Sequence, residues 1–201
     1  MQIEAVRVDQ PMRAGDCHSY CIAHRDDGVS VRIPGYGPGL PLPHDLAHYV
    51  IERELGLGRG FWATVAAGAV FPGMQHLAGR QRPHAAERSR LVQKENGGWV
   101  NQAEVLVGAF MEMVTTGIDA RSQAALALLA NAQGAVAVGS LPVDAATLAR
   151  VCAALRAMAE RWVAVVPGEC MTLEWRGGAR AAVLPHARGR HGGRRALIRA
   201  R

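Results

Sequence analysis

Residues 42–52 have the sequence Leu42-Pro43-His44-Asp45-Leu46-Ala47-His48-Tyr49-Val50-Ile51-Glu52, and the predicted fold is arranged around them. Proline is favoured in the first turn of a helix, and glycine is typical of the position just after a helix ends. Pro43 and Gly56 therefore predict a helix from Pro43 to about Leu55. The glycine and proline residues between 34 and 43 predict an irregular connector before it.

The two sides of this predicted helix differ in chemistry. With about 3.6 residues per turn, one side gathers four polar residues within roughly 100° of arc, namely His44, Asp45, His48 and Glu52. The other side is apolar and is expected to face the core, with Leu46, Ala47 and Val50. The helix thus carries two imidazoles and two carboxylates on one surface.

His44 and His48 are the candidate metal ligands. Two histidines four residues apart on a helix lie above the same turn and can bind one metal ion, and zinc is the metal that this pattern indicates. Helical side chains lean towards the N-terminus, so we expect Glu52 to hydrogen-bond His48 rather than to bind the metal. The third ligand is left open among five candidates: Glu87, Glu104, Glu112, His76 and His84.

The His44-Asp45-x-x-His48 spacing resembles the His-Glu-x-x-His helix of zinc peptidases. The resemblance implies a metal-dependent hydrolase with Asp45 in the place of the general-base glutamate. Asp45, with Glu52 acting on His48, is then the candidate catalytic pair. Aspartate is a departure from the family pattern, because its carboxylate is drawn back by about one carbon–carbon bond length. Ile51 is another, since one group of these peptidases has glycine there.

A second class of metal-dependent enzymes uses an adjacent His-Asp pair. Phosphohydrolases of the HD type join this pair to an upstream histidine and a downstream aspartate, and His24, His44-Asp45 and Asp119 occur in that order. The resemblance implies a wholly helical fold, whereas His24 falls in a predicted β-hairpin. We therefore rank this hypothesis below the zinc-peptidase resemblance.

The same region also resembles a block shared by a group of uncharacterised bacterial proteins. It comprises Pro43-His-Asp-Leu-Ala-His48, Glu52, Leu55-Gly-Leu57, Gly60-Phe-Trp62 and Ala66-Ala-Gly68, and so covers roughly residues 40–70. The resemblance implies that the block is a family hallmark, and it brings no activity with it. Phe61 and Trp62 are expected to pack in the core or, alternatively, to line a pocket beside His48.

The competing interpretation of this helix is structural. An aspartate in the first turn suits the helix dipole, and His48 with Glu52 forms an ordinary pair four residues apart on a solvated face. On this hypothesis the chain is a non-enzymatic interaction or scaffold protein, and its His/Glu helix is a structural or partner-facing surface.

Strand patterns occur towards both ends of the chain. Residues 2–9, 16–25 and 29–33 are predicted strands, and Asp27-Gly28 between the last two is a hairpin signal. Residues 171–175 alternate between apolar and polar, and a turn at 176–179 is predicted to lead into a returning strand over 181–184.

The first hairpin contains Cys17-His18-x-x-Cys21-x-x-His24, which has the residue types of a zinc site. Side chains alternate along a strand, so the two cysteines and the two histidines would point to opposite faces. We therefore expect small buried cysteines here instead.

Residues 62–71 are predicted to form a short, nearly all-apolar helix and residues 85–95 a polar one. Apolar stripes with helical spacing predict three further helices, over residues 101–114, 124–132 and 144–165. Asn96-Gly97-Gly98 is expected to end the 85–95 helix, and Asn101 to begin the 101–114 helix. Residues 72–85 are predicted to be a loop. Four arginines lie in and after this loop, namely Arg80, Arg82, Arg88 and Arg90. We expect them to form a solvated face or, alternatively, to bind an anionic ligand.

The composition bounds the class of protein. The chain has 201 residues, of which 49% are hydrophobic and 20% charged, as in one globular domain. Four cysteines in this length do not indicate a disulfide framework. The absence of a signal-peptide pattern or an apolar run long enough to span a bilayer predicts a cytoplasmic protein without membrane contact.

The net charge of +6 is unevenly distributed. Eight arginines and no acidic residue lie in residues 176–201, which leaves 15 basic and 17 acidic residues in the rest of the chain. We expect a mobile basic tail over residues 185–201, and nucleic acid or another polyanion is its candidate partner.

These patterns predict one α+β domain over residues 1–184. Its antiparallel sheet combines the N-terminal strands with a C-terminal hairpin and packs against about five helices. The leading functional hypothesis is an intracellular protein with a metal site on the 43–55 helix that acts as a metal-dependent hydrolase. The non-enzymatic interaction or scaffold protein is the alternative.

Overall fold

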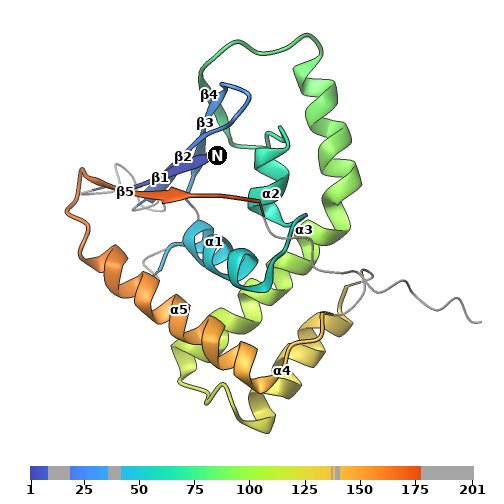
Figure 1. Ribbon diagram of the computed structural model, residues 1–201, viewed down its shortest axis with the longest axis vertical. Helices are drawn as coiled ribbons and strands as arrows, with labels where there is room; N and C mark the ends of the chain where they lie inside the picture. The colour runs from blue at the N-terminus through green and yellow to red at the C-terminus, as the bar shows by residue number, and fades with distance from the viewer. Residues whose placement is uncertain (9–18, 36–41, 137, 139–140, 178–201) are drawn as a thin grey trace, which may run out of the picture.

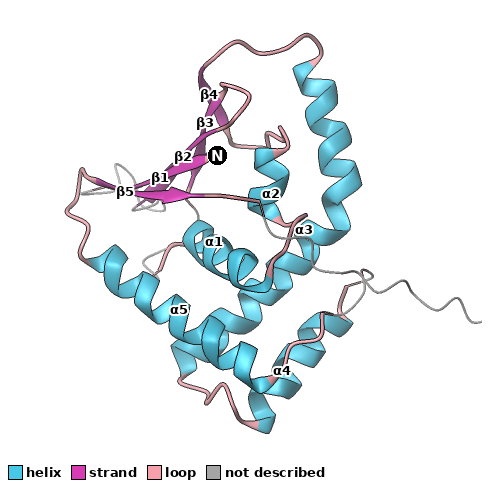
Figure 2. Ribbon diagram, viewed as in Figure 1, coloured by secondary structure: helices cyan, strands magenta, loops and turns pink. Residues whose placement is uncertain are grey.

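The computed structural model describes residues 1–8, 19–35, 42–136, 138 and 141–177. In chain order the elements are β1 (Gln2–Arg7), β2 (Ser19–His24), β3 (Ser30–Pro34), α1 (His44–Leu55), α2 (Phe61–Ala66), β4 (Gln75–Ala78), α3 (Ala85–Thr116), α4 (Gln123–Gly134), α5 (Ala145–Val163) and β5 (Cys170–Glu174). The strands gather on one side of the molecule, and the helices occupy the rest (Figure 2). The predicted α+β class is confirmed.

The five strands form one antiparallel sheet in the order β4-β3-β2-β1-β5. Its register pairs Ala5 with Cys21 and Cys21 with Ile33, and on the other side of β1 it pairs Ile3 with Leu173. Since side chains alternate along each strand, these residues share one face of the sheet, and all of them are buried. This face supplies one wall of the hydrophobic core.

The hairpin expected at Asp27-Gly28 is confirmed by the pairing of β2 with β3. Gly28 has a φ of +81°, a backbone conformation that glycine adopts without strain. Cys21 is buried as expected, whereas Cys17 and His18 of the Cys/His motif lie outside the described residues.

The C-terminal strand is confirmed as β5, which pairs with β1 at the edge of the sheet. The returning strand over 181–184 and the basic tail lie outside the described residues. The prediction of a loop over residues 72–85 is wrong in part, because β4 pairs with β3 there. Its four side chains are all exposed, so no apolar pattern marks this edge strand.

Helix α1 lies at the centre of the molecule, packed against α2, α3 and α5 (Figure 1). Gly56 ends it in the left-handed conformation and donates its N–H to the carbonyl of Arg53, as its sequence position predicts. Leu46, Ala47 and Val50 are buried, which confirms the predicted core side. The opposite side is not the solvated face of the structural interpretation, because neighbouring helices cover it.

Helix α3 is continuous over 32 residues, so the predicted break at Asn96-Gly97-Gly98 is wrong. Glycine costs only about 1 kcal/mol relative to alanine inside a helix, and local contacts offset this. The Asn96 amide donates to Thr64 Oγ1 and accepts from Arg59 Nε, so it is not free to terminate the helix. Asn101, predicted to begin a new helix, lies within α3.

The remaining helix boundaries follow their capping residues. Ser122 accepts a hydrogen bond from the Ala125 N–H at the start of α4, and Asp144 accepts one from the Thr147 N–H at the start of α5. Helix α2 is shorter than the predicted 62–71 helix. No helix in the described part of the chain is long and apolar enough to cross a membrane.

Candidate metal centre

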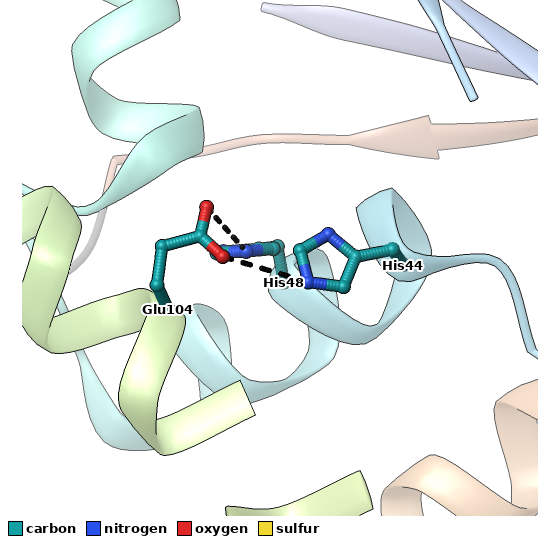
Figure 3. A group of neighbouring side chains, drawn as sticks. All are labelled: His44, His48 and Glu104. Atoms are coloured by element: carbon teal, nitrogen blue, oxygen red, sulfur yellow. Dashed lines mark ion pairs between the residues drawn. The ribbon is translucent and has the colours of Figure 1, made fainter. Parts of the chain in front are cut away.

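Three potential metal ligands converge between α1 and α3. His44 and His48 project from one side of α1 towards Glu104 on α3 (Figure 3). Nε2 of His44 lies 3.5 Å from Oε2 of Glu104, and Nε2 of His48 lies 3.3 Å from Oε1 of the same carboxylate. Among the described residues, this is the one cluster of three or more His, Cys, Asp or Glu side chains whose donor atoms all lie within 4.8 Å of one another.

These separations suit a tetrahedral ion. Bonds of about 2.0–2.2 Å to nitrogen and oxygen place neighbouring ligands of tetrahedral zinc about 3.4 Å apart. Both nitrogen–oxygen separations in the cluster are close to this value. The imidazole rings of His44 and His48 meet edge to face with centroids 4.7 Å apart, and their donor atoms lie within 4.8 Å of each other and of the Glu104 carboxylate.

The His48 ring is hydrogen-bonded at one nitrogen and contacts a second carboxylate at the other. Its side chain is 1% exposed, and Nδ1 makes a 2.9 Å hydrogen bond with Oε1 of Glu52, as the sequence predicts. Nε2 is buried and lies 3.3 Å from Oε1 of Glu104, an ion-pair contact that does not meet hydrogen-bond geometry. A metal ion held between Nε2 and this carboxylate would satisfy both groups.

Glu52 is completely buried and holds His48 from the side opposite Glu104. Its carboxylate also accepts the backbone N–H groups of Phe61 at 2.8 Å and of Trp62 at 3.0 Å, which are the first residues of α2. Trp62 in turn donates its indole N–H to the carbonyl of Asp45. Glu52 therefore positions His48 and the start of α2, and it does not line the cavity beside the cluster.

The close approach of Gly60 to Glu52 gives a first prediction. A Cβ atom at position 60 would lie 2.5 Å from Cδ of Glu52, so Gly60→Ala must displace the carboxylate or the start of α2. We expect the free energy of unfolding to fall by about 1–3 kcal/mol, as for other overpacked sites. Gly97→Ala is the matched control, because nothing lies within 4 Å of its added Cβ. Denaturant titration should show that variant to be unchanged or slightly more stable, and equal behaviour of the two variants would contradict this packing.

Charge and burial shift the protonation of the cluster. Burial by itself lowers the pKa of His48, but the carboxylates of Glu104 and Glu52 on its two sides outweigh this and raise the pKa to about 9. Burial lowers the pKa of His44, and the nearby His48 acts in the same direction. Contact with His48 lowers the pKa of Glu104. In the metal-free protein the raised pKa of His48 favours its protonated form between Glu104 and Glu52, although burial also raises the pKa of Glu52.

Asp45 is the second carboxylate on α1 at this site. Burial raises its pKa to about 7, with Glu104 acting in the same direction and His48 in the opposite one. A carboxylate that titrates near neutral pH is suited to accept and release a proton in catalysis.

A cavity of about 370 Å³ adjoins the cluster. His44, Asp45, His48 and Glu104 form its polar wall, and the remaining lining residues are Ile33, Pro34, Phe61, Phe71, Pro72 and Met74. Phe61 contacts the His48 ring with centroids 5.4 Å apart, whereas Trp62 is fully buried. Trp62 thus packs in the core, and Phe61 lines the pocket beside His48, so each residue meets one of the two alternatives expected from the sequence.

The structure also separates the five candidates for a third ligand. Glu104 joins the two histidines, and Glu112 is exposed on the same helix. His84 and Glu87 lie near each other at the exposed start of α3, and His76 hydrogen-bonds the carbonyl of Gly79. No feature of the sequence distinguishes Glu104 from the other four, because its position depends on how α3 packs against α1.

The residue set of the HD-type hypothesis is not assembled. Nδ1 of His24 hydrogen-bonds Ser30, and Nε2 lies 3.5 Å from Glu4, on the sheet. Asp119 caps a turn through the N–H of Arg121. Neither His24 nor Asp119 belongs to the metal-ligand cluster found in the described residues. The set of metal ligands that the HD-type hypothesis requires is therefore wrong for this protein.

The chain was compared with known protein families, curated proteins and solved structures. No protein-family model, curated protein or solved structure matches the chain.

Proposed function

We propose that His44, His48 and Glu104 bind one zinc ion and that the chain is a metal-dependent hydrolase. The observation that carries this proposal is the convergence of three donor groups, because the Nε2 atoms of His48 and His44 lie 3.3 and 3.5 Å from the Glu104 carboxylate. Histidine ligands of zinc commonly donate their second N–H to a carboxylate, which fixes the ring and strengthens the ligand. Glu52 supplies this carboxylate.

Three protein ligands beside a cavity favour a catalytic over a structural ion. Structural zinc is closed by four protein ligands, whereas catalytic zinc keeps a position open for water or substrate. The cavity of about 370 Å³ offers this space, and its apolar walls lower the local dielectric. Zinc bound there supplies a Lewis acid and lowers the pKa of a bound water.

Asp45 is the general base in this proposal. It follows the first histidine ligand directly, as glutamate does in the His-Glu-x-x-His helix that the segment resembles. It lines the cavity, and burial keeps its pKa near neutral in the absence of metal. Its role is to accept a proton from the attacking water and to pass it to the leaving group.

The role of Asp45 can be tested with Asp45→Asn. We expect zinc content to stay unchanged and kcat/KM for p-nitrophenyl acetate or a fluorogenic peptide to fall at least about a hundredfold, the usual contribution of a general base. Asp119→Asn, at an exposed residue outside the site, is the matched control and should retain full activity. If the zinc-loaded protein hydrolyses neither probe, the hydrolase proposal is wrong, and equal activity of the two variants would exclude Asp45 as the base.

Zinc binding is expected to release about one proton at pH 7. His48 has its pKa raised to about 9, so it is protonated in the metal-free protein and must lose the proton from Nε2 to bind zinc. Affinity should therefore increase with pH until about pH 9, where this competition ends. Calorimetric titration in two buffers with different ionisation enthalpies measures the released proton, and an enthalpy independent of the buffer would contradict the expectation.

The second candidate function is non-enzymatic. The observation that favours it is that His48, as a cation, already contacts Glu52 and Glu104 and so joins α1, α2 and α3 without a metal. This function predicts a protein that is folded and complete without zinc. Stoichiometric zinc in the wild type that is lost in the histidine variants would support the metal-dependent function. Equal trace metal in both would support the non-enzymatic one.

The resemblance over residues 40–70 supports the same site. Residues that carry it include His44, His48 and Glu52, and also Gly60 and the aromatic pair that follows. In this chain these residues supply two of the three ligands and the hydrogen bonds behind His48. We propose that the block is a family hallmark because it builds this centre. A cytoplasmic location of the protein is also part of the proposal.

A further inference from the structure

A second and larger cavity, of about 620 Å³, shares a wall with the first. Phe71, Pro72 and Met74 line both cavities. The other walls of the larger cavity come from the β2–β3 turn, from β3 and from the beginning of α3. The two cavities are therefore adjacent, with Phe71, Pro72 and Met74 between them.

Positive charge dominates the larger cavity. Four arginines line it, namely Arg25, Arg82, Arg88 and Arg90, against one acidic residue, Asp27. Arg25 is paired with Asp27, and none of the other three forms an ion pair with a described residue. The rest of the lining is largely apolar, with Val29, Val31, Val70, Phe71 and Val92 among its residues. The cavity thus combines an apolar body with four arginines and one carboxylate, Asp27, which interacts with Arg25 and Arg82.

Arg25 carries the second observation. Its side chain is 7% exposed, and its Nε and Nη2 donate to the two carboxylate oxygens of Asp27. Nη1 is buried without a hydrogen-bond partner. A guanidinium has five N–H groups in a planar fork that matches carboxylate and phosphate oxygens. The pairing with Asp27 therefore fixes the Arg25 side chain at the cavity wall, with Nη1 buried from solvent.

We propose that this cavity binds the carboxylate or phosphate end of a small ligand with an apolar body. The guanidinium groups of Arg82, Arg88 and Arg90 bind the anionic oxygens, Arg25 adds positive charge at the wall, and the valine and phenylalanine side chains pack against the body. This part of the proposal rests on the proposed function: the ligand is the substrate of the hydrolase. The bond that is cleaved lies on the other side of the Phe71–Met74 wall, at the metal centre.

The test uses the full chain without zinc and phenyl phosphate as the probe. We expect calorimetric binding of phenyl phosphate, weaker binding of inorganic phosphate and no binding of phenol, because both the anion and the apolar body contribute. Binding of 3-phenylpropionate relative to phenyl phosphate decides between carboxylate and phosphate. Binding of neither anionic probe would overturn the proposal.

Arg82→Gln/Arg88→Gln is the variant of choice, because both side chains are exposed and their loss leaves the Arg25–Asp27 pair intact. We expect the dissociation constant for the bound probe to rise at least tenfold, on the order expected for two lost charge-assisted contacts. Arg121→Gln, an exposed arginine outside the cavity, is the matched control and should bind as the wild type does. Equal affinity of the double variant and the control would overturn the proposal.

The outcomes also separate this proposal from the proposed function. His44→Ala should bind phenyl phosphate with unchanged affinity, because His44 does not line the larger cavity. Anion binding without zinc binding would overturn the hydrolase alone. Zinc-dependent hydrolysis without anion binding would overturn the anion site alone.

Discussion

His44→Ala is expected to remove stoichiometric zinc while leaving the fold intact. The variant takes away one of three ligands, and the remaining pair, His48 and Glu104, cannot enclose the ion. Loss of an outer-shell partner alone weakens metal binding about 10–100-fold, so loss of a ligand should raise the zinc dissociation constant more than about a hundredfold. Competition with a chromophoric chelator measures this constant.

The same variant should change the stability of the metal-free protein little. The His44 side chain is 37% exposed, and its contact with Glu104 is partly screened by solvent, so we expect less than about 1 kcal/mol. His76→Ala is the matched control, since this exposed imidazole is not in the ligand cluster. If both variants keep wild-type zinc affinity, His44 is not a ligand.

Replacing Glu52 is expected to have the largest effect on stability. Glu52→Ala removes the counter-ion of buried His48 and the acceptor of two backbone N–H groups at the start of α2. Breaking a buried ion pair by removing one partner costs about 3–5 kcal/mol, and we expect a loss of this order in denaturant unfolding. Glu112→Ala, at an exposed carboxylate on α3, should change stability by less than about 0.5 kcal/mol.

Glu52→Gln separates the positioning role from the structural one. The amide keeps the shape of the side chain and one acceptor oxygen, but its NH2 group faces an N–H donor that the carboxylate bound. We therefore expect the variant to fold with lower stability than the wild type and higher stability than Glu52→Ala. It removes the negative charge behind His48, and we expect zinc affinity to fall about 10–100-fold, as for other partners of metal-bound histidines. Unchanged zinc affinity in a folded Glu52→Gln protein would show that Glu52 supports only the packing of α1 and α2.

The parts of the site that the sequence predicts are those that a single helix determines. His44 and His48 are one turn apart, and Glu52 is one turn further on, so their shared face and the His48–Glu52 hydrogen bond follow from helix geometry alone. The ends of α1 are likewise predicted by Pro43 and Gly56. No knowledge of the tertiary fold is needed for either result.

Long-range packing determines the rest. Glu104 and Glu112 lie on the same helix, and only the approach of α3 to α1 brings the first of them to the histidines. Tertiary contacts also override local signals at Asn96, whose amide is bound by Arg59 and Thr64 instead of ending the helix. The arginine-lined cavity forms only where the β2–β3 turn meets α3. The sequence therefore groups Arg82, Arg88 and Arg90, which are close in the chain, but it does not connect them with Arg25.

The central claim is that His44, His48 and Glu104 bind one zinc ion, and X-ray absorption at the zinc edge of the zinc-loaded full chain tests it most directly. We expect one ion per chain, with two imidazole nitrogens and one carboxylate oxygen at about 2.0–2.2 Å, and loss of this spectrum in His44→Ala. A spectrum without imidazole scattering, or one that is identical in wild type and variant, would contradict the claim.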